Sequence, residues 1–156
     1  MDGDTSGGLA PIAGIDKDFI RQWLFWAEQH LGYKSLRFVN QLAPSAELRP
    51  AFQTQTDEKD LMPYEVLKEI EVRAIYQRLS PQNVLQQLVQ QYAEIAPAQL
   101  KEYVQKFYRM WSRNQWKRER LAPSFHLDEF SVDPRSWCRF PILSAGFEEE
   151  LEELKV

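Results

Sequence analysis

The sequence predicts a mostly helical fold, a bundle of helices joined by long loops. Apolar residues recur every three or four positions in several separate stretches, which is the period of an amphipathic helix. Nine prolines stand mainly at the expected starts of helices or inside the loops between them. With 156 residues, of which 44% are hydrophobic and 13% aromatic, the chain is long enough to bury a core as one domain.

The first predicted helix covers residues 17–31. Asp16 is its expected N-cap, and Gly32 is the natural residue at which it stops. Phe25 and Trp26 widen the apolar face beyond one stripe, so we expect this helix to pack on two sides or to lie in an interface. The pattern of residues 35–42 does not decide between a short helix and a strand.

Three further helices are predicted between residues 64 and 120. The first covers residues 64–79, and Ser80 with Pro81 then provides an N-cap and a first residue for a helix over 82–92. Pro97 opens the longest helix, whose C-terminal part carries a basic block. This block consists of Arg109, Arg113, Lys117, Arg118 and Arg120. Residues 121–144 combine three prolines with aromatic residues, so we expect them to drape over the core or an interface.

Charge is distributed unevenly along the chain. The net charge of −4 argues against bulk affinity for nucleic acid. The basic block is followed by an acidic end, which predicts a site for an anionic ligand at one end and a solvated tail at the other. This acidic end carries Glu148, Glu149, Glu150, Glu152 and Glu153. The basic block with its neighbouring aromatics could bind single-stranded nucleic acid, but spacing favours the solvent face of a helix.

The cysteine and histidine content limits the chemistry and the compartment. The single Cys138 excludes an intramolecular disulfide and fits a reducing compartment, so we expect a cytoplasmic location. No apolar run is long enough to cross a membrane. Two histidines and one cysteine, widely separated, make no recognisable zinc site. His126 with Asp128 and Cys138 could suggest Cys–His catalysis, but a structural histidine is the favoured interpretation.

The stretch from Pro44 to Tyr64 has neither helical nor strand periodicity. Prolines punctuate it, and the residues between them are threonines, glutamines and acids. Such a loop can order over a phosphate-bearing ligand or be a solvated surface loop, and composition alone favours the surface loop. The role of Lys17 is also undecided by the sequence. A lysine at a helix start is usually exposed to solvent, whereas glycines beside a helix start can form an anion site.

Several motifs resemble those of NAD synthases, particularly the large glutamine-hydrolysing kind. The segment P-S-A-E-L-R-P at 44–50, followed by Q-T-D-E-K-D-L-M-P-Y-E-V-L at 55–67, is similar to the hallmark region of the family. The opening G-D-T-S-G-G-L-A-P-I-A-G-I-D-K resembles the segment that leads to a nucleotide-binding lysine. N-Q-W-K-R-E-R-L-A-P-S-F-H-L-D and D-P-R-S-W-C-R-F-P-I-L-S resemble the C-terminal end of one bacterial branch.

The resemblance implies a carbon–nitrogen ligase that amidates nicotinic acid adenine dinucleotide. Such an enzyme adenylates the nicotinate carboxylate with ATP and Mg²⁺, and ammonia from glutamine then displaces AMP. Carried over by motif, Lys17 and Ser45 would bind ATP, whereas Glu47 and Lys117 would bind the dinucleotide. Smaller family members have histidine where this chain has Trp116. A mobile loop, residues 53–61, would close over the adenylating centre and exclude water. It includes Gln55, Thr56, Asp57 and Glu58.

Several parts of the family pattern are missing from these 156 residues. The S-G-G-x-D-S loop, the parallel sheet, the magnesium-binding acid and the glutamine-hydrolysing domain are absent. We therefore expect residues 1–156 to be the C-terminal piece of the synthetase domain, an α/β fold of the adenine-nucleotide-hydrolase-like (ATP pyrophosphatase) kind. Within it, 1–16 would be a glycine-rich loop, 44–63 the mobile loop, 64–120 helices and 121–156 an aromatic tail with an acidic end.

We expect this piece to be inactive alone and to need the N-terminal synthetase and glutaminase parts as partners. The apolar surface left by the missing sheet should favour a homo-oligomer. One alternative is a stand-alone helical module that binds its ligand through the basic helix, residues 109–120. Another is a non-catalytic subunit that associates with a separate chain bearing the sheet. No nucleic acid and no membrane are expected as partners.

Overall fold

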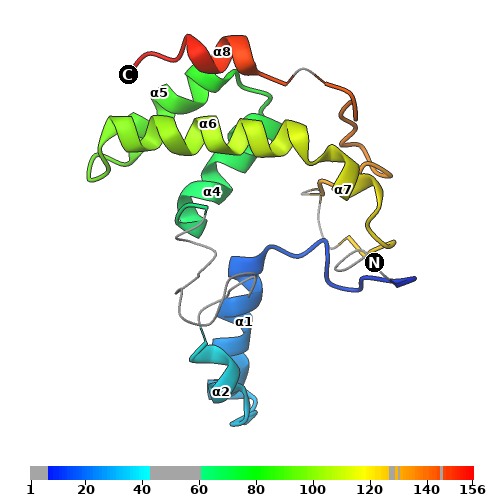
Figure 1. Ribbon diagram of the computed structural model, residues 1–156. Coiled ribbons are helices and arrows are strands. Elements are labelled where there is room, and N and C mark those ends of the chain that lie inside the picture. Colours follow the sequence, from blue (N-terminus) through cyan, green and yellow to red (C-terminus); the bar gives the residue numbers. More distant parts are fainter. Residues whose placement is uncertain (1–6, 43–60, 127–128, 130, 145) are drawn as a thin grey trace, which may run out of the picture.

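A computed structural model of the chain describes residues 7–42, 61–126, 129, 131–144 and 146–156. The described residues are mostly helical, as predicted, and their one β-type pairing is an isolated bridge between Ala10 and Ser124. Figure 1 shows a helical bundle, α4 to α8, with the pair α1 and α2 below it. No helix in the described part of the chain has the length and apolar character that a membrane span requires.

Helix α1 (Lys17–His30) begins and ends where the sequence predicts. The Asp16 carboxylate accepts a hydrogen bond of 2.9 Å from the backbone N–H of Asp18, which caps the helix. Gly32 follows the helix at φ +74°, a conformation that glycine adopts without steric penalty. Residues 36–40, left open by the sequence, form a short helix, α2 (Leu36–Asn40), which packs against α1.

The apolar side chains of α1 are mostly exposed. Ala27 is the one residue of this helix that is buried, whereas Phe19 is 54% exposed and Trp23 48%. Phe25 and Trp26, the residues that widen the apolar face, are 44% and 47% exposed. This helix therefore contributes little to the core of the chain, and the prediction that it lies in an interface remains open.

The predicted helix over residues 64–79 is shorter than expected. Helix α4 (Tyr64–Glu71) continues into a π-helical turn, η2 (Val72–Tyr76), and helical structure then stops. Arg78 has a φ of +54°, and the Leu79 N–H donates to the Arg73 carbonyl at 2.9 Å. Many helices end in this way, with a left-handed residue followed by a backbone hydrogen bond that reaches six residues back. The two residues before Ser80 therefore belong to a turn.

Helix α5 (Pro81–Gln91) starts as predicted, because the Ser80 hydroxyl accepts a hydrogen bond from Asn83 N–H. Helix α6 (Pro97–Arg113) is the longest and lies across α4 and α5. The three helices enclose one core, and apolar residues of the C-terminal segment complete it. The residues at its centre that are no more than 1% exposed are Ile70, Val84, Leu85, Leu88, Leu100, Val104 and Leu151.

The basic block is divided between two helices, in contrast to the single long helix predicted. Helix α6 ends at Arg113, Asn114 has the non-helical angles φ −99° and ψ 14°, and α7 (Gln115–Glu119) follows in a new direction. Asparagine has a low helix propensity, so an interruption of the helix costs little at this position. Arg109 and Arg113 therefore belong to α6, and the other three cations follow the break.

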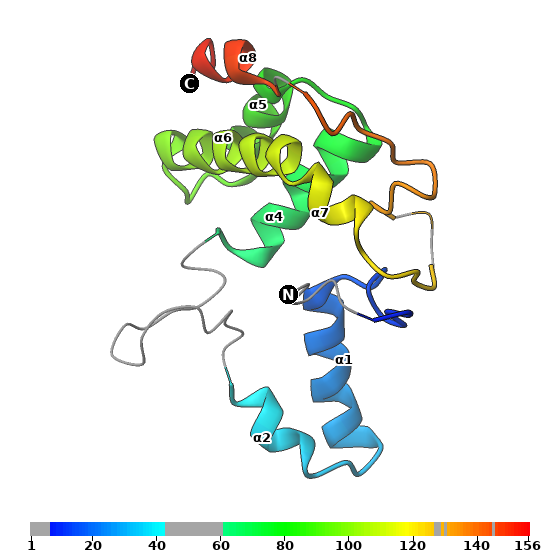
Figure 2. The same cartoon turned by 45° about the vertical axis from the view of Figure 1, so that its right-hand side comes forward.

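The acidic end is not a free tail, although most of its glutamates are exposed to solvent as predicted. Residues 148–152 form helix α8 (Glu148–Glu152), which lies along α5 and α6 (Figure 2). Leu151 is fully buried and Leu154 is 3% exposed. The helix end is held from α6, because the Lys101 Nζ donates to the Leu154 carbonyl at 2.6 Å and the Gln105 amide to the Leu151 carbonyl at 2.9 Å.

The proline- and aromatic-rich segment drapes over the bundle, as predicted. Trp137 contacts the ring of Tyr76 with centroids 5.3 Å apart, and Phe140 contacts Trp111 at 6.3 Å. The segment thus packs against both η2 and α6. The segment also lies near α7, the helix that carries Lys117, because Glu119 of α7 and residues 134–141 line the same hollow.

Candidate functional site

Two of the eight predicted site residues lie in the described part of the chain. Lys17 is the first residue of α1, and Lys117 lies in the middle of α7. The remaining six predictions fall on residues that the structure does not describe. They are Ser45, Glu47, Gln55, Thr56, Asp57 and Glu58.

Lys17 is exposed at the start of α1. Its neighbour Asp16 caps the helix and also forms an ion pair. Asp16 forms an ion pair with Lys68 of α4 at 3.1 Å, and this hydrogen bond raises the pKa of Lys68. The head of α1 is thereby linked to the helical bundle through a surface ion pair, a contact of modest strength.

The segment before α1 meets the segment after α7. The Ala10 N–H donates to the Pro123 carbonyl at 2.9 Å, beside the bridge to Ser124. At Gly14 the two segments approach so closely that a Cβ atom would lie 2.7 Å from the Phe125 carbonyl oxygen. Only glycine fits there without displacing the backbone. This contact connects the segments that carry Lys17 and Lys117.

Helix α7 is held in place by its inward face. Gln115 is 1% exposed, and its side-chain oxygen accepts a hydrogen bond of 3.0 Å from Arg118 Nε. The Arg118 guanidinium lies 3.7 Å from the centroid of the Trp111 ring and also donates to the Trp111 carbonyl. Burial lowers the pKa of Arg118, because the charged form is partly removed from water. Arg118 therefore fixes the angle between α6 and α7.

The outward face of α7 carries an exposed tryptophan with two cations over its ring. Trp116 is 46% exposed. The Lys117 Nζ lies 5.7 Å from the centroid of its ring, and the Arg120 guanidinium carbon lies 6.0 Å from it. Both distances are at the outer limit of cation–aromatic attraction. The predicted substrate-binding lysine is thus part of a small surface of aromatic and positive character, which we call the Trp116 patch: Trp116, Lys117 and Arg120.

The other two cations of the basic block, Arg109 and Arg113, share one carboxylate, which offsets half of their charge. Glu148 of α8 accepts hydrogen bonds from Arg113 at 2.8 Å and from Arg109 at 3.4 Å. These charges lie 35 and 39 residues apart in the sequence, and the fold brings them together. Arg118 is turned onto Trp111, and Glu148 offsets part of the charge of Arg109 and Arg113, so the basic character of residues 109–120 is reduced. This weakens the alternative of a stand-alone module that binds through that helix.

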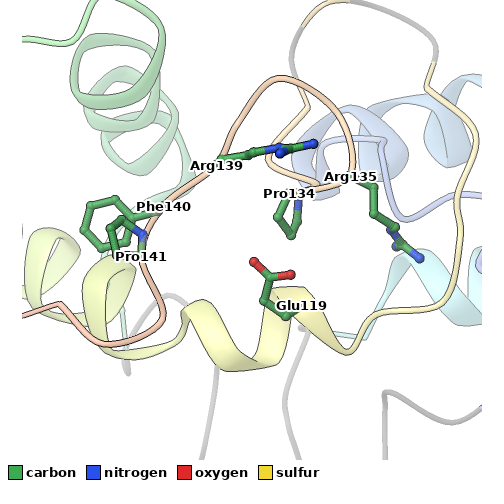
Figure 3. Close-up of a pocket in the computed structure, with 6 residues that line it drawn as sticks. All are labelled: Glu119, Pro134, Arg135, Arg139, Phe140 and Pro141. Atoms are coloured by element: carbon green, nitrogen blue, oxygen red, sulfur yellow. The ribbon is translucent and has the colours of Figure 1, made fainter.

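An open hollow of about 580 Å³ lies beside α7. Figure 3 shows the Glu119 side chain projecting from α7 toward the loop that carries Pro134 and Arg139. Glu119 accepts a hydrogen bond of 2.7 Å from the Gln115 amide. The lining residues are Glu119, Pro134, Arg135, Arg139, Phe140 and Pro141.

Asp133 organises the loop on the far side of this hollow. Its carboxylate accepts a hydrogen bond from Arg135 Nε at 3.0 Å and lies 3.7 Å from His126 Nε2. Burial acts to raise the pKa of Asp133, but the hydrogen bonds from Arg135 outweigh it and the pKa is lowered. Arg135 also donates to the Ala122 carbonyl at 3.0 Å. His126 thus lies near a carboxylate whose hydrogen bonds come from Arg135.

The buried thiol of Cys138 supports the structural interpretation of the His–Cys residues. Cys138 is 7% exposed, and burial raises the pKa of its thiol. Reactive cysteines have a lowered pKa and partial exposure, which is the opposite of this environment. Asp128, the third residue of that reading, is outside the described residues. Among the residues that are described, no three His, Cys, Asp or Glu side chains gather closely enough to hold a metal ion.

Comparison with known proteins places the chain in a family. The sequence profile of the family described as NAD synthase matches residues 2–121. Glutamine-dependent NAD(+) synthetases of Dictyostelium discoideum and Arabidopsis thaliana are 32% and 34% identical, each over 83% of this chain and 18% of its relative. The crystal structure of a glutamine-dependent NAD(+) synthetase from Cytophaga hutchinsonii aligns over 100% of this chain and 23% of its own, with a TM-score of 0.80 and 52% identity.

The chain therefore belongs to the NAD synthase family, which confirms the resemblance of its motifs. It spans about a fifth of the length of the relatives it matches, 18% for both the Dictyostelium and Arabidopsis proteins. The mostly helical architecture is shared with the corresponding part of the Cytophaga hutchinsonii structure.

Sequence reasoning missed two residues that shape the site. Arg118 was grouped with the other cations of the basic block, but its guanidinium faces inward onto Trp111. Glu148 belongs to a run of glutamates that predicts a solvated tail, but in the structure its carboxylate pairs with both Arg109 and Arg113. The one signal for Arg118 in the sequence is its position seven residues after Trp111, which places both residues on one face of a continuous helix. Because the helix breaks at Asn114, this spacing does not predict that Arg118 turns inward.

Proposed function

We propose that the chain forms part of an NAD synthase, a carbon–nitrogen ligase that amidates nicotinic acid adenine dinucleotide at the expense of ATP. The observation that carries this proposal is the match of the family profile to residues 2–121, with relatives named glutamine-dependent NAD(+) synthetase. In this proposal the 156 residues complete an α/β domain of the adenine-nucleotide-hydrolase-like kind. The helices described here would cover a sheet contributed by the rest of the enzyme.

Lys117 is proposed to bind the dinucleotide through a negatively charged group. Its position on the outward face of α7 supports this role, because Arg118 and Gln115 occupy the inward face and leave Lys117 accessible. A lysine ammonium acts as a compact positive charge toward phosphate or carboxylate. Lys17 at the head of α1 is proposed to contact the phosphates of ATP, and it is exposed to solvent there.

ATP and Mg²⁺ are proposed as the co-substrate and its counter-ion. The described side chains include no cluster of three carboxylate, histidine or thiol groups, so no residue described here is assigned to Mg²⁺. The chain's own contribution is to bind and orient the nucleotides. Residues 53–61 are proposed to form the loop that closes over the adenylated substrate and protects it from hydrolysis.

The exposed apolar side chains of α1 support association with other parts of the enzyme. Phe19, Trp23 and Trp26 are each about half exposed, at 54%, 48% and 47%. Apolar side chains gathered on one helix are usually covered by a partner. The proposed partners are the N-terminal synthetase and glutaminase parts, and a homo-oligomer of the assembled enzyme.

A chimeric enzyme tests this function directly. The 156 residues would replace the equivalent segment of the Cytophaga hutchinsonii synthetase, to which they are 52% identical over their whole length. With ATP, glutamine and nicotinic acid adenine dinucleotide, we expect the chimera to form NAD, whereas the isolated chain forms none. A correctly folded chimera without activity would contradict the proposed function. NAD formation by the isolated chain would contradict the expectation that it is inactive alone.

A further inference from the structure

Helix α1 is held to the bundle by polar contacts rather than by apolar packing. It packs chiefly against α2, and the two helices lie below the bundle in Figure 1. Ala27 is its one buried residue, whereas Phe19 and Trp23 of the same helix are exposed. Most helices are oriented by packing an apolar face, so the orientation of α1 relative to the bundle must depend on a few individual contacts.

Two of these contacts reach the same helix of the bundle, α4. The Asp16 carboxylate pairs with the Lys68 Nζ at 3.1 Å. The Arg21 guanidinium carbon lies 5.6 Å from the centroid of the Tyr64 ring. Lys68 and Tyr64 are four residues apart on α4 and therefore share one face of it. Two separate contacts to one face restrict the tilt of α1, which a single contact would leave free.

The Asp16 carboxylate ties the start of α1 to two different partners. Its Oδ1 accepts the hydrogen bond from the Asp18 N–H that caps the helix, and its Oδ2 forms the ion pair with Lys68. Lys17 is the first residue after this cap. The backbone from which Lys17 extends is therefore tied to the helix by one carboxylate oxygen and to the bundle by the other.

Both contacts are weak in energy, but they can still select one orientation of α1. The side chains of Lys68 and Asp16 are 58% and 40% exposed, and 5.6 Å is near the outer limit of cation–aromatic attraction. Contacts of this kind add little to the free energy of unfolding. They can nevertheless decide between orientations of α1, because these differ little in the apolar area that they bury.

We propose that Lys68 and Arg21 are positioning residues, which hold the head of α1 against α4 and so place Lys17 for contact with the phosphates of ATP. This inference rests on the proposed function for the role of Lys17, and it deepens that function by naming what sets the geometry of the contact. In this proposal neither positioning residue touches the nucleotide itself. Their effect therefore appears in the binding of ATP and not in the binding of the dinucleotide.

Residual dipolar couplings of the intact 156-residue chain, measured by nuclear magnetic resonance, test whether these contacts fix α1. In the unchanged chain we expect the backbone N–H couplings of α1 and α4 to fit one common alignment. In the double variant Arg21→Ala/Lys68→Ala the couplings of α1 should become smaller than those of α4, because α1 then samples several orientations. Lys155→Ala is the matched control, since Lys155 is an exposed lysine beyond α8, and it should leave the couplings unchanged.

Steady-state kinetics of the Cytophaga hutchinsonii chimera tests whether this orientation matters for ATP. We expect Lys68→Ala to raise the KM for ATP by about twofold to fivefold, the usual effect of losing one exposed ion pair, with kcat and the KM for the dinucleotide unchanged. Lys68→Arg should restore the KM for ATP, because it keeps a cation within reach of Asp16. A substitution that only destabilised the fold would instead lower the amount of active enzyme and so the apparent kcat.

A double-mutant cycle with Asp16→Asn separates positioning from the simple loss of a positive charge near ATP. Asparagine also caps helices well, so Asp16→Asn removes the ion pair and keeps the cap. In this background Lys68→Ala should have no further effect on the KM for ATP, since the partner of Lys68 is already absent. A direct electrostatic effect of Lys68 on ATP would persist in both backgrounds.

Three results would overturn the proposal. One is a set of α1 couplings that is the same in the double variant and in the unchanged chain. Another is a KM for ATP in Lys68→Ala equal to that of the Lys155→Ala control. The third is an equal effect of Lys68→Ala with and without Asp16→Asn. A folded chimera that forms no NAD would instead contradict the proposed function, and the couplings of the 156-residue chain would then still support or overturn the fixing of α1 by these two contacts.

Discussion

Removal of the Arg118 side chain should loosen α7 and lower the stability of the chain. Arg118 makes three contacts that no neighbour can replace. It stacks on the Trp111 ring at 3.7 Å, donates to the Trp111 carbonyl, and donates to Gln115 Oε1 at 3.0 Å. In Arg118→Ala the Trp111 carbonyl and the buried Gln115 side chain lose their charged donor.

The size of the effect follows from these contacts. A partly desolvated cation–aromatic contact contributes about 1–2 kcal/mol, and a hydrogen bond from a charged donor about 1.5–3 kcal/mol. Burial of the guanidinium, which lowers the pKa of Arg118, offsets part of this gain. We therefore expect a loss of about 2–3 kcal/mol in the free energy of unfolding. For a chain of this length that corresponds to a Tm decrease of roughly 5–10 °C.

Thermal unfolding followed by circular dichroism measures this change. Arg118→Lys should recover little stability, because an ammonium cannot form the planar stack and the two directed hydrogen bonds together. Arg139→Ala is the matched control, since Arg139 is exposed and its side chain has no recorded ion pair among the described residues; it should change the free energy of unfolding by less than about 0.5 kcal/mol. Equal Tm values for Arg118→Ala and Arg139→Ala would refute the assigned role.

Three further predictions concern the core and its titratable groups. Leu151→Ala should lower the free energy of unfolding in urea by about 3 kcal/mol, because Leu151 is fully buried. Glu152→Ala should be nearly neutral, because Glu152 is exposed. Equal effects of the two substitutions would show that α8 is not docked on the bundle. Burial, and then Asp16, raises the folded-state pKa of Glu71 above its ordinary 4.5, so stability should fall as pH rises through that raised pKa. Glu71→Gln should abolish this fall in Tm between acidic and neutral pH, and an unchanged pH profile would contradict it. Cys138, with its pKa raised by burial, should react with iodoacetamide far more slowly in the folded chain than in urea, and equal rates would show that the thiol is accessible.

Local signals in the sequence were sufficient to predict where most helices begin. Asp16, Ser80 and Pro97 mark three helix starts, and each acts through the backbone within three residues of itself. Such a signal needs no knowledge of the rest of the fold. Helix ends were harder to predict. The turn at Arg78 and the break at Asn114 have no glycine or proline to mark them in the sequence.

Contacts between distant segments could not be read from the sequence. Glu148 is 39 and 35 residues from its partners Arg109 and Arg113, so the pairing appears only when α8 docks on α6. The buried Leu151 and Leu154 drive that docking, but a cluster of glutamates around them has the composition of a solvated segment.

The candidate site could be predicted from the sequence only through motifs. The resemblance identified Lys117 and the family, and the family is confirmed by the comparisons. The roles of Lys17 and Lys117 remain predictions, and those of the residues between 43 and 60 lie outside the described structure. Periodicity could not distinguish Trp111 from Trp116, because the break at Asn114 turns one inward and the other outward.

We propose that α7 presents Lys117 to the dinucleotide substrate of an NAD synthase. Steady-state kinetics of Lys117→Ala in the Cytophaga hutchinsonii chimera tests it most directly, with Lys34→Ala, an exposed lysine outside α7, as the control. Loss of one charge-assisted contact predicts a KM for the dinucleotide higher by about tenfold to a hundredfold, with the KM for ATP unchanged. A dinucleotide KM equal to that of the Lys34→Ala control, or a change confined to the KM for ATP, would contradict the account.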